Sequence, residues 1–174
     1  MRIISGIYKS RILKTPSSGK VRPTSDRAKE TLFNVLNNVI DFEGIKCLDL
    51  FCGTGNLGLE CISRGADMCY FIDEQTDLVI KNIRLLNAED KSKVFKSKAL
   101  SFLNKFTEKE IDVIFCDPPY SYEPYNELIE KISLFKTILI LEHSKDFIVS
   151  KNFEKNVFLK KKIGTVNFTF FDFN

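Results

Sequence analysis

The sequence contains no tryptophan, a single histidine and no long run of uncharged apolar residues. A helix that spans a membrane needs about 18 or more predominantly apolar residues in succession, and no segment provides them. The start of the chain, from Met1 to Gly6, also lacks the apolar stretch of a signal peptide. We therefore expect a cytoplasmic protein that does not associate with membranes.

The chain carries five cysteines, and no two of them form a CxxC pair. Cys47, Cys69 and Cys116 lie in apolar segments, where a cysteine is usually a buried, reduced thiol. The lone histidine, His143, cannot complete a zinc site with cysteines that are so widely scattered. The sequence therefore predicts no disulfide and no bound metal, and it gives His143 a structural role.

A chain of 174 residues is long enough for one domain with a real hydrophobic core. We divide this single domain into a basic N-terminal extension, residues 1–44, and a core, residues 45–174. Residues 1–29 carry eight basic side chains against Asp26 alone, so this segment has a net charge of +7 while the rest of the chain sums to −4. Such a concentration of positive charge favours contact with a nucleic acid over a merely solvated surface. The residues expected to make this contact are Arg2, Arg11, Lys14, Arg22 and Arg27.

Short apolar runs alternate with helical stretches through the core. Strands are predicted near residues 46–51, 68–73, 93–96, 111–116 and 137–142, and helices near 55–64, 76–87, 99–106 and 124–133. This alternation indicates βαβ units and a largely parallel sheet, which is the α/β class. The tail differs, because its two apolar runs, near 155–161 and 165–172, meet at a turn with no helix between them. They predict an antiparallel hairpin at the edge of the sheet.

The N-terminal extension is predicted to contain a small hairpin, a loop and a helix. Residues 2–14 alternate loosely between apolar and basic types, as the strands of a hairpin do. Ser25 or Asp26 can cap a helix whose apolar positions, from Ala28 to Ile40, follow the helical period. That helix is expected to pack on the core.

A glycine-rich turn follows the first predicted strand of the core. Residues 53–58 match the pattern G-x-G-x-x-G, and Asp73 ends the next predicted strand. Glycines let the backbone approach a ligand closely, amides at a helix start bind anionic groups, and Asp73 can accept both hydroxyls of a ribose. This placement favours a nucleoside-bearing cofactor, either NAD or S-adenosylmethionine, over a tight turn without a ligand. Asp49 lies inside the preceding apolar strand, where an unpaired carboxylate is costly, so we expect a cationic partner such as the cofactor's amino group.

The most specific motif is Asp117-Pro118-Pro119-Tyr120, at the carboxyl end of the fourth predicted strand. Ligands bind at that end of the strands in open α/β sheets. Two prolines stiffen the loop, so its carbonyl groups and the Asp117 carboxylate can be held as a rigid set of acceptors. Acceptors that bond both hydrogens of an aromatic amine favour the pyramidal nitrogen needed to attack a sulfonium methyl group. Because Tyr120 can stack on an unpaired or flipped base, the motif predicts methyl transfer to an exocyclic amine of a nucleobase.

Several segments together resemble one known family. Residues 22–34 (RPTSDRAKETLFN), the glycine-rich turn, residues 101–103 (SFL) and the DPPY motif are similar to the RsmD family of bacterial 16S ribosomal RNA guanine-N2 methyltransferases. The resemblance covers nearly the whole chain and implies a class I S-adenosylmethionine-dependent methyltransferase fold, which is Rossmann-like, with strand order 3-2-1-4-5-7-6. It also implies that the substrate is the N2 amine of a guanine in 16S ribosomal RNA, at position 966. We expect a monomer that meets this RNA within a small-subunit particle.

The resemblance also implies roles for individual residues. The implied cofactor-binding residues are Asp49, Gly53, Gly55, Asp73 and Ala99. The implied catalytic residues, which present the guanine amine, are Asp117, Pro118 and Tyr120. The chain departs from the family before Ala99, because an adenine-contacting Asn or Asp often precedes that position and Lys98 stands there instead. The adenine contact is therefore expected from the backbone of Ala99.

Three alternatives stay open. A DNA adenine-N6 methyltransferase would also carry DPPY and the glycine turn, but most such enzymes have a larger target-recognition region than this chain can supply. A nicotinamide-dependent dehydrogenase shares the glycine pattern, yet it leaves DPPY unexplained and needs a substrate domain for which too few residues remain. A non-catalytic RNA-binding assembly factor for the ribosome would explain the basic extension but not the rigid acceptor loop.

Overall fold

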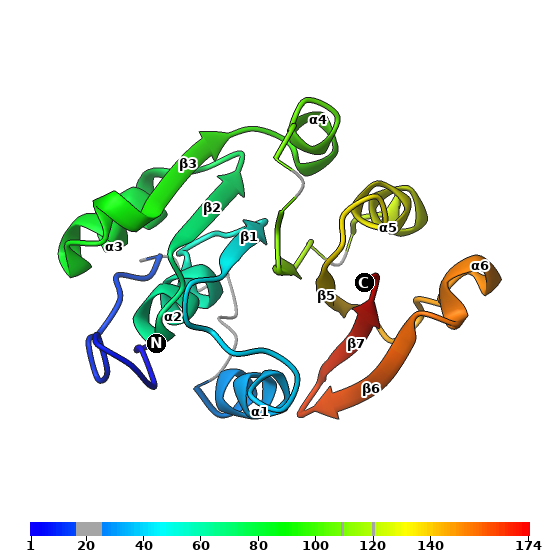
Figure 1. Cartoon of the computed structure of the whole chain (residues 1–174), viewed down its shortest axis with the longest axis horizontal. Helices are drawn as coiled ribbons and strands as arrows, with labels where there is room; N and C mark the ends of the chain where they lie inside the picture. Colours follow the sequence, from blue (N-terminus) through cyan, green and yellow to red (C-terminus); the bar gives the residue numbers. More distant parts are fainter. Residues whose placement is uncertain (17–25, 109, 120) are drawn as a thin grey trace.

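A computed structural model describes residues 1–16, 26–108, 110–119 and 121–174. Within these ranges, seven strands form one sheet in the order β3-β2-β1-β4-β5-β7-β6 (Figure 1). The parallel strands are β1 (Lys46–Leu50), β2 (Met68–Asp73), β3 (Ser92–Lys96), β4 (Val113–Cys116) and β5 (Ile138–His143). β7 (Val166–Asp172) is antiparallel both to β5 and to β6 (Val157–Ile163). This topology confirms the predicted mostly parallel sheet with a C-terminal antiparallel hairpin.

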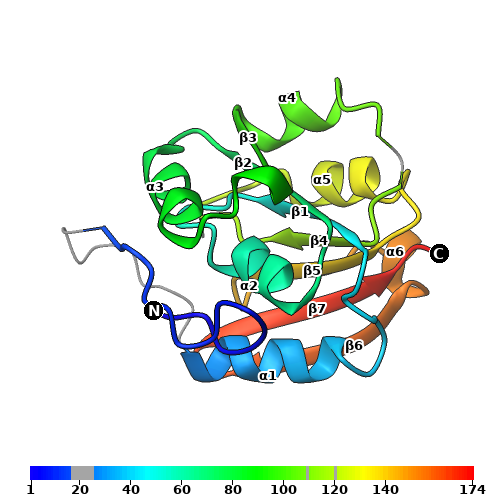
Figure 2. The ribbon, with the colours of Figure 1, turned by 60° about the vertical axis from the view of Figure 1, so that its left-hand side comes forward.

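Helices cover both faces of the sheet (Figure 2). One face carries α1 (Asp26–Leu36), α2 (Asn56–Arg64) and α3 (Asp77–Leu86), and the other carries α4 (Ala99–Leu103) and α5 (Tyr125–Ile132). A 3-10 turn (Glu89–Lys91) leads into β3, and the short α6 (Lys151–Glu154), which was not predicted, leads into β6. None of the helices in the described ranges is long and apolar enough to cross a membrane.

The central strands carry near-continuous apolar sequences because both of their faces are buried. In β5, Ile138 and Ile140 join the core on the α1–α2 side, whereas Leu139 and Leu141 join the core on the α4–α5 side. Side chains alternate between the faces along a strand, so Asp49 of β1 faces the α1–α2 side together with Cys47. The α1–α2 side of the sheet therefore receives a carboxyl group that is surrounded by apolar residues.

The register of the parallel strands brings their carboxyl ends to one edge of the sheet. Leu50 of β1 lies opposite Ile72 of β2 and Cys116 of β4, and Cys116 in turn lies opposite Leu141 of β5. The residues that follow these positions, on four different strands, are therefore close in space although they are far apart in the sequence. This edge is where an open α/β sheet binds ligands.

A buried ion pair fastens the N-terminal segment and α1 to α2. Lys29 of α1 and Glu60 of α2 are both fully buried, and Nζ of Lys29 lies 2.9 Å from Oε2 of Glu60. The Glu60 carboxylate also accepts the backbone N–H groups of Ile4, at 2.8 Å, and Ser5, at 3.0 Å. Nε of Arg64 lies 3.0 Å from its other oxygen. One carboxylate thus joins three elements of the fold.

The predicted small N-terminal hairpin is present as an antiparallel bridge between Arg2 and Ile12 and three backbone hydrogen bonds between the two arms, but it forms no regular strands. The backbone of this segment bonds α2 instead of pairing fully with itself. The N–H of Ile7 donates to the carbonyl of Ser63 at 2.8 Å, and the N–H of Tyr8 donates to Oγ of Ser63 at 2.9 Å.

The helix predicted from residue 26 begins there but ends four residues earlier than Ile40, the last apolar position of its pattern. Val39 is 49% exposed and contributes nothing to the buried face. The side-chain amide of Asn38 donates to the carbonyl of Asn34 at 2.9 Å, which is the local side-chain bonding by which asparagine competes with a continuing helix.

Candidate active site

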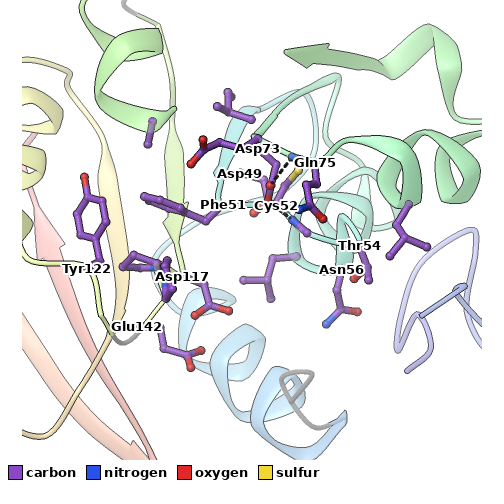
Figure 3. Close-up of a pocket in the computed structure, with 18 of the residues that line it drawn as sticks. Asp49, Phe51, Cys52, Thr54, Asn56, Asp73, Gln75, Asp117, Tyr122 and Glu142 are labelled. Carbon is purple, nitrogen blue, oxygen red and sulfur yellow. Dashed lines mark hydrogen bonds between the residues drawn. The ribbon is translucent and has the colours of Figure 1, made fainter. Parts of the chain in front are cut away.

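A cavity of about 1780 Å³ opens at the carboxyl ends of the parallel strands (Figure 3). Its walls come from the turn after β1, the end of β2, the start of α4, the loop after β4 and the first turns of α1. The predicted site residues that line it are Asp49, Gly53, Asp73, Ala99, Asp117, Pro118 and Arg27. The fold therefore collects into one cavity residues that the sequence places more than 80 positions apart.

The turn after β1 is held in left-handed backbone conformations. Gly53 has a φ of 53°, and Phe51, which carries a side chain, has a φ of 60°. That conformation costs a residue other than glycine about 1 to 2 kcal/mol, so the packing around Phe51 must maintain it. Its ring meets the ring of Tyr122 edge-on, with 5.1 Å between the centroids. A Cβ atom at Gly53 would meet nothing nearer than 4.0 Å, so a ligand can approach the backbone there.

The other two glycines of the pattern permit close packing. A Cβ atom at Gly55 would lie 2.6 Å from the side chain of Val79, and one at Gly58 would lie 2.4 Å from the ring of Phe71. Gly55 also has a φ of 76°, which favours glycine. Gly55 does not line the cavity, so its predicted contact with a cofactor stays a prediction.

Asp73 organises the turn from the end of β2. Its Oδ2 accepts the N–H of Gly53 at 2.8 Å, and its Oδ1 accepts the N–H of Gln75 at 2.9 Å (Figure 3). Each carboxylate oxygen can accept a second hydrogen bond. Asp73 therefore keeps acceptor capacity toward the cavity while it holds the turn in place.

Asp49 is buried beneath the same turn, and only 3% of its surface is exposed. Its Oδ2 accepts the N–H of Gly58 at 2.9 Å. Burial raises the pKa of Asp49 well above its usual range, although that hydrogen bond opposes the rise. Among the described residues, no basic side chain forms an ion pair with it. A cation bound in the cavity would stabilise the charged form of this carboxyl group.

Asp117 and Pro118 follow β4 and line the cavity. Burial raises the pKa of Asp117 to about 6, and a hydrogen bond with Glu142 opposes the rise. The carbonyl of Pro119 accepts the N–H of Tyr122 at 2.7 Å, which folds the loop back on itself. Tyr120, the last residue of the motif, lies outside the described residues, so its stacking role stays a prediction.

The sequence argument missed Glu142, which stands near the end of β5 and lines the cavity. Only 8% of its surface is exposed. Burial and the neighbouring Asp117 raise the pKa of Glu142 to about 8. Figure 3 shows the carboxyl groups of both residues pointing into the same space. The available signal was a charged residue near the end of an otherwise apolar strand, which is the same signal that drew attention to Asp49.

Ala99 begins α4 and is buried in the cavity wall. Lys98 precedes it in an extended conformation and provides no side-chain cap for the helix. The first turn of α4 is therefore without a capping side chain, and both Lys98 and Ala99 line the cavity.

Two of the predicted nucleic-acid-binding residues already have partners within the protein. Nε of Arg2 lies 3.2 Å from a carboxylate oxygen of Asp26, and both side chains are solvent-exposed. Nη2 of Arg11 donates to the carbonyl of Leu85 at 2.9 Å. Exposed contacts of this kind are weak, so both cations can exchange them for phosphate groups.

The remaining basic residues are divided between the cavity and the surface. Arg27 of α1 lines the cavity, and Lys14 is exposed. Arg22 lies outside the described residues. Lys161 and Lys162 of β6 line the cavity although the sequence argument did not select them. Positive charge therefore reaches the cavity from both ends of the chain.

His143 and the cysteines take no part in the cavity wall apart from Cys52. Nδ1 of His143 donates to the carbonyl of Ser144 at 2.8 Å, so its Nε2 accepts the hydroxyl of Thr169 at 2.9 Å. Burial lowers the pKa of His143. All five cysteines are buried free thiols. No group of His, Cys, Asp or Glu side chains in the described ranges is arranged to hold a metal ion.

The chain is similar to one protein family and to several proteins described as methyltransferases. The family described as Conserved hypothetical protein 95 matches residues 1–172. YlbH of Bacillus subtilis, described as a candidate rRNA methyltransferase, is 32% identical over 174 residues, which cover 97% of this chain and 91% of that protein. Ribosomal RNA small subunit methyltransferase D of Escherichia coli is 43% identical over 124 residues, which cover 69% of this chain and 60% of that protein. The solved structure of yhhF from Escherichia coli, described as a candidate methyltransferase, has a TM-score of 0.80 and 32% identity, and the match covers 99% of this chain and 97% of that one.

Proposed function

Because the chain belongs to the family described as Conserved hypothetical protein 95, the RsmD family, we propose that it transfers a methyl group from S-adenosylmethionine to the N2 amine of a guanine in 16S ribosomal RNA. One observation carries the proposal. The glycine-rich turn after β1 and the Asp117-Pro118 loop after β4 line the same cavity. The reaction needs a cofactor site next to groups that accept hydrogen bonds from the target amine. These two elements would supply both.

The residues around the turn fit S-adenosylmethionine. The open space over Gly53 admits a ligand to the backbone, and Asp49 is a buried carboxyl group with no cationic partner among the described residues, as expected of a partner for the cofactor's amino group. Asp73 keeps acceptor capacity for the ribose hydroxyls, and Ala99, which lines the cavity, would contact the adenine through its backbone. When bound, the cofactor supplies an electrophilic methyl group on a sulfonium ion.

The loop after β4 would act on the nucleophile. The lone pair of an aromatic amine is delocalised into the ring, so the amine attacks poorly. Hydrogen bonds from its two hydrogens to the Asp117 carboxylate and to the adjoining backbone carbonyl would localise that lone pair and aim it. The nitrogen becomes positive when the N–C bond forms, and Asp117 can then accept the proton that it releases. Pro118 contributes by fixing the direction of these acceptors.

The basic residues that come from both ends of the chain would hold the RNA. Arg27, Lys161 and Lys162 line the cavity, and Arg2, Arg11 and Lys14 extend positive charge along the N-terminal segment. Contacts with phosphate position a nucleic acid without reading its sequence, so the choice of base must be made deeper in the cavity. We propose that the protein binds this RNA within a small-subunit particle.

The decisive experiment uses labelled S-adenosylmethionine with small-subunit RNA, and separately small-subunit particles, from a strain that lacks this gene. Nucleoside analysis should then find N2-methylguanosine. A parallel reaction with DNA tests the adenine-N6 alternative, which methyladenosine in that DNA would support. Absence of methyl transfer to either RNA or particles would support the non-catalytic assembly factor.

The role of Asp117 can be tested separately from binding. The Asp117→Ala variant should lose about 100-fold or more in turnover, as loss of a preorganised polar group does, while calorimetry finds near-normal cofactor affinity. Asp146→Ala is the matched control, because Asp146 is an exposed carboxylate away from the cavity wall. Wild-type turnover in the Asp117→Ala variant would refute the amine-acceptor role.

A further inference from the structure

Three carboxyl groups face the same side of the sheet on adjacent strands. Asp49 stands in β1, Asp117 directly follows β4, and Glu142 stands in β5. Phe115 lies opposite both Asp49 and Ile140, and Asp117 and Glu142 each follow these positions by two residues. The proposed function gives Asp49 and Asp117 a role each. It leaves Glu142 without one.

Burying the carboxyl group of Glu142 costs the protein folding free energy. Its Oε2 is fully covered and has no hydrogen-bond partner among the described residues. A carboxylate buried without donors costs several kcal/mol, and natural proteins rarely tolerate one outside a functional site. The carboxyl group also lines the cavity beside Asp117 (Figure 3). A ligand that brings hydrogen-bond donors into the cavity would satisfy it.

Asp117 and Glu142 are neighbouring buried carboxyl groups whose pKa values are both raised. The two carboxyl groups are within hydrogen-bonding reach, and carboxylates can bond each other only when a proton lies between them. Burial and the charge of Asp117 raise the pKa of Glu142 to about 8, so the pair retains one proton near neutral pH. Two adjacent donors on a ligand could replace that proton, which would leave to solvent.

Guanine presents such a pair of donors. Its Watson–Crick edge carries the ring N1–H next to the N2 amine, and a base flipped into a pocket is read by that edge. We propose that Glu142 recognises the target base as guanine by accepting the ring N1–H, while Asp117 accepts a hydrogen of the neighbouring N2 amine. This inference rests on the proposed function and names the residue that selects its substrate.

The same geometry would exclude the other amino-bearing bases. In adenine and in cytosine, the ring nitrogen next to the amine is an acceptor. That nitrogen can bond Glu142 only while Glu142 keeps its proton, and above about pH 8, where Glu142 is ionised, its lone pair would face the carboxylate. A site built to receive a donor rejects an analogue that lacks it far more strongly than an apolar pocket could. Glu142 would thus separate guanine methylation from adenine methylation on one DPPY scaffold.

The test changes the hydrogen-bonding character of the groups on both sides of the proposed bond. The probes are small-subunit RNAs ligated around one synthetic segment, in which the methylated guanosine is either kept or replaced by 2-aminopurine ribonucleoside. That analogue keeps the 2-amine but lacks O6, and its ring N1 accepts rather than donates. The protein variants are Glu142→Gln, whose amide can donate to such a nitrogen, and Glu127→Gln, an exposed control on α5.

Above about pH 8, where Glu142 is ionised, the wild type and the Glu127→Gln variant should methylate guanosine at least about 10-fold more efficiently, in kcat/KM, than 2-aminopurine ribonucleoside. The Glu142→Gln variant should lose about 10- to 100-fold on guanosine and reverse or abolish that preference. Cofactor affinity, measured by calorimetry, should stay within about twofold in both variants.

Two outcomes overturn different conclusions. If the wild type forms methylguanosine and the Glu142→Gln variant keeps the wild-type preference, Glu142 does not read the base although the proposed function stands. If the wild type methylates no guanosine, the proposed function itself is refuted. A Glu142→Gln variant that fails to fold would be recognised by lost cofactor binding, and Glu142→Asp, which keeps the carboxylate, should then retain the preference for guanosine. Loss of that preference in a folded Glu142→Asp variant would refute the assignment as well.

Discussion

The ion pair of Lys29 and Glu60 should make a large and asymmetric contribution to stability. Both side chains are fully buried, and Glu60 serves four donors from three elements. Removing one partner of a buried pair typically costs about 3 to 5 kcal/mol, because the other charge stays buried without compensation. We expect this cost for Glu60→Gln. Burial lowers the pKa of Lys29 while Glu60 opposes that shift, so its ammonium depends on this carboxylate.

The Lys29→Met variant should cost less, about 1 to 3 kcal/mol. Glu60 keeps Arg64 and two backbone donors, and only Oδ1 of Asn56 and the carbonyl of Arg2 lose a partner. The double variant should cost less than the sum of the two single variants, because the pair is coupled.

Urea unfolding at pH 7 measures these differences as shifts in midpoint at constant slope. The matched control is Asp67→Asn, which breaks an exposed pair with Lys91 and should cost below about 1 kcal/mol. The reasoning is refuted if Glu60→Gln costs no more than this control, or if Lys29→Met costs more than Glu60→Gln. Strictly additive single variants would show that the two charges do not depend on each other.

Four further predictions concern the cavity and its surroundings. Asp73→Ala should lower cofactor affinity by about 1 to 3 kcal/mol in calorimetry, and unchanged affinity would remove Asp73 from the site. Gly58→Ala should destabilise the fold by about 1 to 3 kcal/mol in urea, because its Cβ would lie 2.4 Å from a ring of β2; an unchanged midpoint would contradict this packing. Replacing Arg11 and Lys14 with Ala should flatten the slope of log RNA affinity against log salt by about 1.5 units in filter binding, without changing cofactor affinity; an unchanged slope would place the RNA elsewhere. Because the folded state raises the pKa of Glu142 from 4.5 to about 8, its contribution to stability is present below pH 4.5 and is lost as the pH rises through about 8, so Glu142→Gln should gain stability relative to the wild type between those values; a constant difference in urea midpoint would refute this.

The sequence by itself determined the sheet and the position of its ligand site. Alternating apolar runs and helical stretches predicted the parallel strands, because a strand buried on both faces must be apolar throughout. The Gly53 turn and the Asp117 loop could be placed at strand ends without coordinates, since a break in an apolar run marks where a strand ends. The position of the ligand site then followed from the rule that parallel strands end at one edge.

Tertiary structure alone decided which residues outside those motifs matter. Lys29 looked like one of many basic residues in the extension, yet it is fully buried because Glu60, 31 positions later, faces it from α2. The local signal at Glu142 is only a charged residue near the end of an apolar strand, and its unmet acceptor lies beside Asp117 because β4 and β5 are neighbours in the sheet. Local periodicity reports which side of an element is apolar, but it cannot report which two polar groups meet there. That depends on strand order and helix placement, which are set by the packing of the whole chain.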